Sequence, residues 1–139
     1  MSIQQSDVLY TAVAVAENGR DGRVATDDGK LDVVVNPPKE MGGSGAGTNP
    51  EQLFAAGYSA CFQGALGVVA RQEGADVSDS TVTAKVGIGR NSDGFGIIVE
   101  ISADIPKVDA GTARSLVEKA HQVCPYSKAT RGNITVVLV

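Results

Sequence analysis

Residues 48–74, TNPEQLFAAGYSACFQGALGVVARQEG, form the stretch that decides the fold of this 139-residue chain. The threonine and asparagine that precede Pro50 can each cap a helix, and proline suits the first helical position. Gly74 can end the helix in a left-handed conformation. The stretch therefore predicts one long helix that begins at Pro50 and runs to about Gln72.

The predicted helix is apolar on nearly all sides, because no charged residue occurs from Gln52 to Ala70. That length is enough to cross a membrane. However, Ser59 and Gln63 interrupt the apolar run, and the chain has no second segment of this kind. A helix of this character is typical of the buried core of a globular fold. We therefore expect a central core helix and no membrane insertion.

Strand patterns precede this helix. Three short stretches either alternate in polarity or are rich in valine, and they predict strands at residues 8–15, 23–26 and 31–35. Asp28-Gly29 joins the last two as a hairpin turn. This part of the chain therefore predicts a three-stranded meander.

The sequence after the central helix predicts a hairpin, a second helix and a last strand. The hairpin strands are residues 81–88 and 95–105, and residues 134–139 form the last strand. Asp109 caps the second helix, and Pro125 ends it. The order βββ-α-ββ-α-β, with mostly antiparallel pairing, predicts an α+β fold with a long buried central helix.

Composition narrows the possible chemistry. The length predicts a single domain over residues 1–139. Two cysteines and one histidine exclude a disulfide-stapled scaffold, a four-thiolate zinc site and an imidazole cluster within one chain, so we expect no metal. A net charge of −4 argues against nucleic acid as a partner. The first residues lack the features of a secretory signal peptide, which favours a cytoplasmic location.

The two cysteines head the list of candidate reactive groups. Cys61 lies in the middle of the central helix, where Gly57 and Gly64 share its face and indicate that something packs closely there. Cys124 ends the second helix on its apolar stripe. Either both are inert core thiols, or a positive side chain lowers the pKa of one of them and makes it a nucleophile. His121 is most simply a surface residue.

Three segments resemble the organic hydroperoxide resistance proteins, a subgroup of the OsmC-like superfamily. Residues 49–62, NPEQLFAAGYSACF, are similar to the first cysteine motif of these proteins. Residues 123–127, VCPYS, are similar to the second, and residues 19–22, GRDG, to the segment that carries an arginine. The resemblance implies an OsmC-like fold and an intertwined homodimer with two active sites at the subunit interface.

The resemblance also implies an activity, the reduction of alkyl and fatty-acid hydroperoxides by a thiol peroxidase. Cys61 would be the peroxidatic residue and Cys124 the resolving one. Arg20 would activate the thiolate, and Glu51 would hold that arginine. No bound cofactor is implied, because dithiols of lipoylated proteins, such as dihydrolipoamide, would regenerate the enzyme. A guanidinium suits this role because it stays charged and favours the thiolate.

Three aromatic residues of these motifs, Tyr58, Phe62 and Tyr126, offer apolar surface for an alkyl or fatty-acyl substrate and are candidate substrate-binding residues. A different class of function stays open beside the enzyme. The chain could be a dimeric module that binds a small apolar ligand and whose cysteines are inert.

The spacing of Glu51 and Cys61 constrains any shared site. Ten residues separate them, which is about 15 Å along a continuous helix. Either the helix begins after Glu51 and the preceding loop folds back, or the Glu51 near a given Cys61 comes from the partner chain. The second arrangement is slightly favoured, because small residues on the helix would let two helices approach closely.

Overall fold

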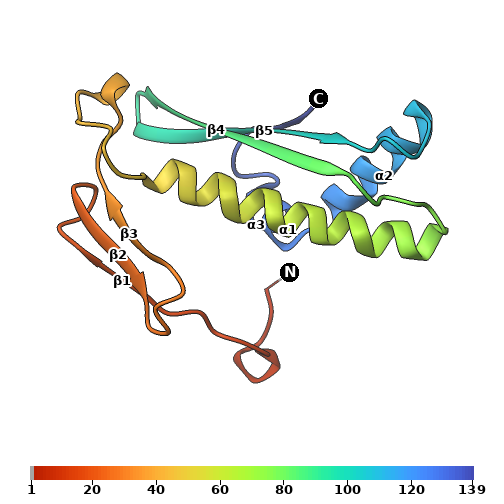
Figure 1. Ribbon diagram of the computed structural model, residues 1–139, viewed down its shortest axis with the longest axis horizontal. Coiled ribbons are helices and arrows are strands. Elements are labelled where there is room, and N and C mark those ends of the chain that lie inside the picture. Colours follow the sequence, from red (N-terminus) through yellow and green to blue (C-terminus); the bar gives the residue numbers. More distant parts are fainter. Residues whose placement is uncertain (1) are drawn as a thin grey trace. The chain divides into compact units, whose positions relative to one another are not determined.

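The computed structural model describes residues 2–139, and the chain divides into two compact units, Met1–Pro50 and Glu51–Val139 (Figure 1). Each unit is described by itself. The single domain expected over residues 1–139 stays a prediction.

The first unit contains a three-stranded antiparallel sheet in the order β1-β2-β3. Its turns follow from local chemistry. Asn18 and Gly19 have φ angles of 59° and 58° between the first two strands, and Gly29 has a φ of 71° in the next turn, as a left-handed backbone requires. The elements of this unit are the 3-10 turns η1 (Gln5–Asp7) and η2 (Lys39–Met41) and the strands β1 (Ala14–Glu17), β2 (Gly22–Thr26) and β3 (Asp32–Val35).

The predicted meander is confirmed, but the first predicted strand is wrong over residues 8–13. The neighbouring strand β2 has only five residues. It pairs with Ala14–Glu17 and ends before it could pair with residues 8–13. Leu9 and Tyr10 are accordingly 101% and 78% exposed. The segment between β3 and the first helix also contains the short 3-10 turn η2.

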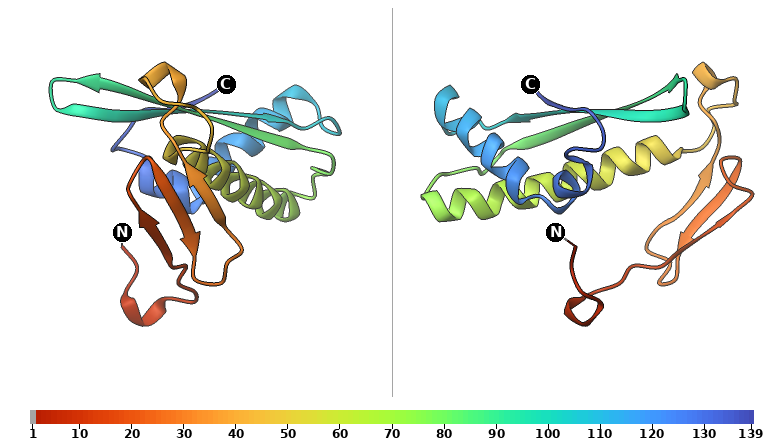
Figure 2. Two further views of the ribbon diagram at one scale, coloured as in Figure 1. Left: turned by 60° about the vertical axis from the view of Figure 1, so that its left-hand side comes forward. Right: turned by 180° about the vertical axis from the view of Figure 1, so that it is seen from behind.

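The second unit packs helices on one face of a three-stranded sheet in the order β4-β5-β6 (Figure 2). The long hairpin of β4 and β5 is antiparallel, with Asn91 paired to Gly94 at its turn, whereas β6 runs parallel to β5. The elements of this unit are α1 (Pro50–Glu73), β4 (Thr81–Asn91), β5 (Gly94–Asp104), α2 (Ala110–Val123), α3 (Pro125–Thr130) and β6 (Val136–Leu138).

The core of this unit forms between the sheet and α1 and α2. Alternate residues of β5 point to opposite faces, so Val99 and Ile101 are buried while Ile98 is 61% exposed. Leu116 of α2 is also fully buried. The side of α1 that faces this core carries Tyr58, Phe62, Ala65, Leu66, Val69 and Ala70.

The opposite side of α1 is exposed along the stripe Ala56, Ala60 and Gly64. The predicted long central core helix is confirmed, although in the single chain only its core-facing side is buried. By length and composition α1 is also the one described helix that could cross a membrane, although its core-facing side packs on the sheet.

Two further features differ from the sequence-based expectation. Pro125 does end α2, but it also begins the short helix α3, where its missing N–H costs nothing at the first helical position. The last strand is shorter than predicted and pairs in parallel with β5, whereas mostly antiparallel pairing was expected.

The predicted cap of the second helix is confirmed, because the Asp109 carboxylate accepts a hydrogen bond from the Thr112 N–H.

Candidate thiol site

The structure brings the two predicted reactive residues together. The Sγ atoms of Cys61 and Cys124 are 3.6 Å apart, and both side chains are free thiols. Cys61 comes from the middle of α1, and Cys124 occupies the corner between α2 and α3. A disulfide has an S–S distance of about 2.05 Å, so a movement of about 1.5 Å would join them. The pair is therefore positioned for reversible bond formation.

The surroundings of the two sulfurs differ. Cys124 is completely buried, whereas Cys61 is partly accessible. Burial raises the pKa of the Cys61 thiol above its ordinary value, while the backbone N–H of Tyr126 acts in the opposite direction. Since only the thiolate is strongly nucleophilic, a positive group at this sulfur would be needed to activate it.

Tyr126 explains why residue 57 is a glycine. A Cβ atom added to Gly57 would lie 3.0 Å from the Tyr126 hydroxyl and 3.2 Å from its ring. The expected close approach is thus confirmed at Gly57, where the neighbour is a ring of the same chain. At Gly64, by contrast, an added Cβ would meet nothing within 4 Å in the described chain.

The aromatic residues near the thiols form one cluster. The rings of Phe54, Tyr58 and Tyr126 have centroids 5.6 to 6.1 Å apart. Tyr126 is 39% exposed, whereas Tyr58 and Phe62 are completely buried. Of the three candidate substrate-binding residues, only Tyr126 therefore presents surface outside the core, and the binding roles of all three stay predictions. Tyr58 and Phe62 pack the core.

A cavity of about 480 Å³ opens beside this cluster and is largely apolar. Tyr126 is one wall, and its backbone N–H acts on Cys61, which ties the cavity to the thiol pair. The lining residues are Phe54, Ile97, Tyr126, Ala129, Thr130, Asn133 and Ile134.

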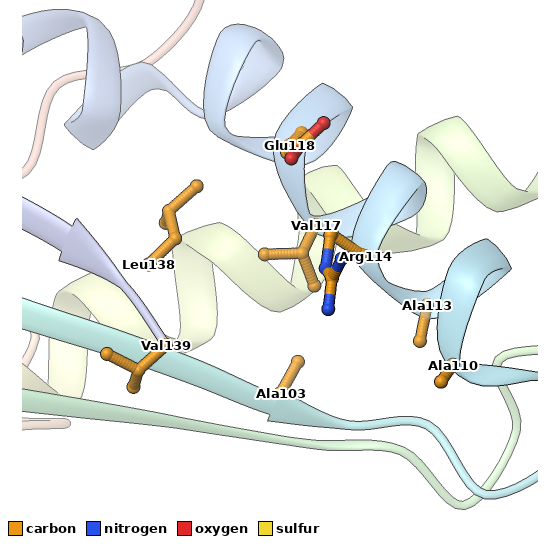
Figure 3. Close-up of a pocket in the computed structure, with 8 residues that line it drawn as sticks. All are labelled: Ala103, Ala110, Ala113, Arg114, Val117, Glu118, Leu138 and Val139. Atoms are coloured by element: carbon orange, nitrogen blue, oxygen red, sulfur yellow. The ribbon is translucent and has the colours of Figure 1, made fainter.

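A second cavity, of about 350 Å³, lies between α2 and the strands β5 and β6 (Figure 3). Val117 and Arg114 extend from α2 toward Ala103 on the sheet. Its lining shares no residue with the first cavity and includes neither a cysteine nor a ring of the aromatic cluster, so this cavity is separate from the thiol site.

A buried group of hydroxyls lies behind the thiols, and sequence reasoning missed it. The Tyr58 hydroxyl is 2.9 Å from Ser127 Oγ and 3.0 Å from Thr130 Oγ1. His121 Nδ1 is 2.8 Å from the same Ser127 oxygen. The interpretation of His121 as a surface residue is therefore wrong: it is partly buried, and desolvation, aided by the charge of Arg131, lowers its pKa.

Arg20 and Glu51 occupy different units of the chain. Arg20 is an exposed residue of the turn between β1 and β2. Glu51 lies in the first turn of α1, in the same continuous helix as Cys61. The alternative in which the helix begins after Glu51 is therefore wrong, and helical rise separates Glu51 from Cys61 of the same chain by about 15 Å. The roles of both residues stay predictions.

Within residues 2–139 no group of three His, Cys, Asp or Glu side chains is arranged to hold a metal ion.

Comparison with known proteins identifies the family. A family model described as OsmC-like protein matches residues 42–139. The chain is 53% identical to the organic hydroperoxide resistance protein of Xanthomonas axonopodis pv. citri, over 94% of both chains. It therefore belongs to the OsmC-like family and, within that family, to the organic hydroperoxide resistance proteins.

Solved structures agree with this assignment. The organic hydroperoxide resistance protein of Legionella pneumophila superposes with a TM-score of 0.91 at 45% identity, over 95% of this chain and 97% of that one. OhrB of Bacillus subtilis gives a TM-score of 0.86 at 44% identity, over 94% and 98%. The predicted OsmC-like α+β fold is thereby confirmed.

Proposed function

We propose that this chain is a thiol peroxidase that reduces organic hydroperoxides and so contributes to resistance against them. The observation that carries the proposal is the 3.6 Å separation of the Cys61 and Cys124 sulfurs, one partly accessible and the other buried. The names of the relatives, organic hydroperoxide resistance proteins from several bacteria, support the same substrate class.

The chemistry divides between the two cysteines. The Cys61 thiolate attacks one oxygen of the peroxide, so an S–O bond forms, the O–O bond breaks, and the alkoxide leaves and takes up a proton to become an alcohol. Cys61 is then a sulfenic acid. The Cys124 sulfur attacks Cys61, the S–S bond forms, and the sulfenic oxygen leaves as water. An external dithiol reduces this disulfide and is itself oxidised to a disulfide.

Activation of Cys61 falls to Arg20 in this proposal. Burial raises the pKa of the Cys61 thiol, and a guanidinium at the sulfur would favour the thiolate and stabilise the leaving alkoxide. Glu51 would hold that guanidinium. Helical rise keeps Glu51 about 15 Å from Cys61 of the same chain, which supports a site shared between two subunits of a homodimer.

The apolar cavity beside Tyr126 favours an alkyl or fatty-acyl hydroperoxide over hydrogen peroxide, which gains nothing from apolar walls. Dithiols of lipoylated proteins are the proposed reductant, no bound cofactor takes part, and the proposed location is the cytoplasm.

The decisive experiment counts thiols before and after one equivalent of an alkyl hydroperoxide. We expect the wild-type chain to lose both thiols. Cys61→Ser should abolish hydroperoxide consumption, because no nucleophile remains. Cys124→Ser should consume one equivalent and stop at the sulfenic acid, which mass spectrometry would detect.

Two outcomes would reject the peroxidase. One is an unchanged rate of consumption in Cys61→Ser. The other is a wild-type chain that keeps both thiols, which would favour the module that binds a small apolar ligand through inert cysteines.

A further inference from the structure

Four polar side chains, three of them buried and His121 partly buried, form a continuous chain of hydrogen bonds between the helices that carry the two thiols. The chain runs from His121 in α2 through Ser127 in α3 and Tyr58 in α1 to Thr130 in α3. Thr130 Oγ1 is in turn 3.0 Å from the backbone carbonyl of Tyr126. Tyr58 and Ser127 have no exposed surface, and Thr130 has 6%.

Each hydroxyl has one proton, and this fixes the direction of every bond in the chain. Thr130 donates its proton to a backbone carbonyl, which can only accept, so Tyr58 must donate to Thr130. Tyr58 has then used its proton and must accept from Ser127.

By the same reasoning Ser127 has used its only proton, so it must accept from His121. The imidazole therefore carries hydrogen on Nδ1. A protonated histidine also has hydrogen on Nδ1, so the direction of the chain does not change when His121 titrates.

The helices that this chain ties together are those that carry the sulfurs. Tyr58 is one turn before Cys61 in α1, and His121 is one turn before Cys124 at the end of α2. Ser127 and Thr130 lie in α3, directly after Cys124. A second contact closes the same corner, because Arg131 Nη1 donates to the His121 carbonyl at 2.9 Å.

Burial alone does not require polar groups here. Apolar side chains of the same shape would fill this space at little cost, whereas a hydrogen-bonded chain imposes fixed distances and angles. Among residues 2–139 no buried side-chain nitrogen or oxygen lacks a hydrogen-bond partner, so this series of hydrogen bonds has no unsatisfied buried member.

We propose that His121, Ser127, Tyr58 and Thr130 are positioning residues that hold the α2–α3 corner against α1 and so keep the Cys124 sulfur within reach of Cys61. This proposal rests on the proposed function, because positioning matters only if the two sulfurs react. The Tyr126 N–H that lowers the pKa of Cys61 belongs to the same first turn of α3 and would be held with it.

The test uses pairs of variants that keep or remove one donor. In His121→Asn the amide nitrogen lies about where Nδ1 was, whereas in His121→Gln it lies nearer the place of Nε2. Thr130→Ser keeps the hydroxyl, and Thr130→Val removes it while it preserves the shape.

The readout is the equilibrium between the protein disulfide and dithiothreitol, which reports the effective concentration of Cys124 at Cys61 and needs no peroxidase activity. We expect the equilibrium constant for disulfide formation to fall about tenfold in His121→Gln and Thr130→Val, a typical loss for one buried hydrogen bond. His121→Asn and Thr130→Ser should stay within about twofold of the wild type.

Equal constants in the two members of each pair would overturn the proposal, whether all four variants match the wild type or all four fall together. Circular dichroism at the temperature of measurement verifies that each variant is folded. A further outcome is that the equilibrium constants of the two members of each pair differ as expected while the wild type consumes no hydroperoxide. In that case the positioning role of the four residues is supported and the peroxidase function is rejected.

Discussion

Glycine has two different roles at two positions of α1, Gly57 and Gly67. At Gly57 the space for a Cβ atom is taken by the Tyr126 ring, whereas at Gly67 the nearest neighbour is the Arg71 guanidinium at 3.6 Å, an ordinary contact with a flexible group. The same residue type therefore serves close packing in one place and not in the other.

Gly57→Ala tests this difference. The added methyl group would push Tyr126 by a few tenths of an ångström, and overpacking of this kind costs more than the helix propensity that alanine supplies. We expect the free energy of unfolding to fall by about 1 kcal/mol in urea titrations. The matched control Gly67→Ala should be neutral or stabilising. Equal effects of the two substitutions would contradict the packing role of Gly57.

The sequence could predict the place of some site residues and not of others. Cys61 and Cys124 stand in recognisable local motifs, so their meeting at 3.6 Å was expected. His121 was misjudged because its partner Ser127 lies six residues away in the short helix α3, which the sequence did not predict. A serine and a threonine three residues apart after Pro125 were the only available signal.

At the scale of the element, local signals predicted helix ends well and the pairing of strands less well. Asp109 caps α2 through bonds to Thr112 within its own first turn, so the sequence contains all that is needed. The parallel position of β6 depends on partners in β5, far away in the chain, and the shortness of β1 depends on the length of β2.

The Asp109 cap predicts a dependence on pH. Its hydrogen bonds from Thr112 lower the pKa of the carboxyl, so the cap contributes fully above the ordinary carboxyl range. That contribution is lost as the pH falls through the lowered pKa of the folded state. We expect Asp109→Ala to lower the melting temperature by about 2 to 6 °C at neutral pH.

Asp109→Asn separates the cap from its charge. The amide oxygen can still accept the Thr112 N–H, so the neutral-pH melting temperature should stay close to that of the wild type while the acid dependence becomes shallower. An acid profile identical to that of the wild type would show that Asp109 does not contribute to it.

At the scale of the whole molecule, the single chain leaves much apolar surface uncovered. Leu9, Tyr10, Phe95 and Ile98 are each at least 61% exposed, and the small residues of the α1 stripe are exposed as well. Surface of this kind is typical of a protein that associates with another chain. It supports the homodimer in which the proposed active site is shared.

A charge on the α1 stripe tests that association. We expect Ala60→Glu to weaken the dimer at least tenfold in sedimentation velocity experiments, because a carboxylate would be buried without a partner. The control Gln72→Glu, at the exposed end of α1, should leave the dimer intact. A monomeric Ala60→Glu that keeps full peroxidase activity would exclude a shared site, and an unchanged dimer would exclude this stripe from the interface.

The parallel strand β6 also determines the order in which the second unit can form. The β4–β5 hairpin joins residues that are close in the chain, and such hairpins form within microseconds. The pairing of β6 with β5 closes a loop that contains both α2 and α3, and loops of this kind form late because their closure costs entropy first. The corner that holds Cys124 lies inside that loop, so we expect the two sulfurs to reach their final positions late in folding, after the β4–β5 hairpin has formed.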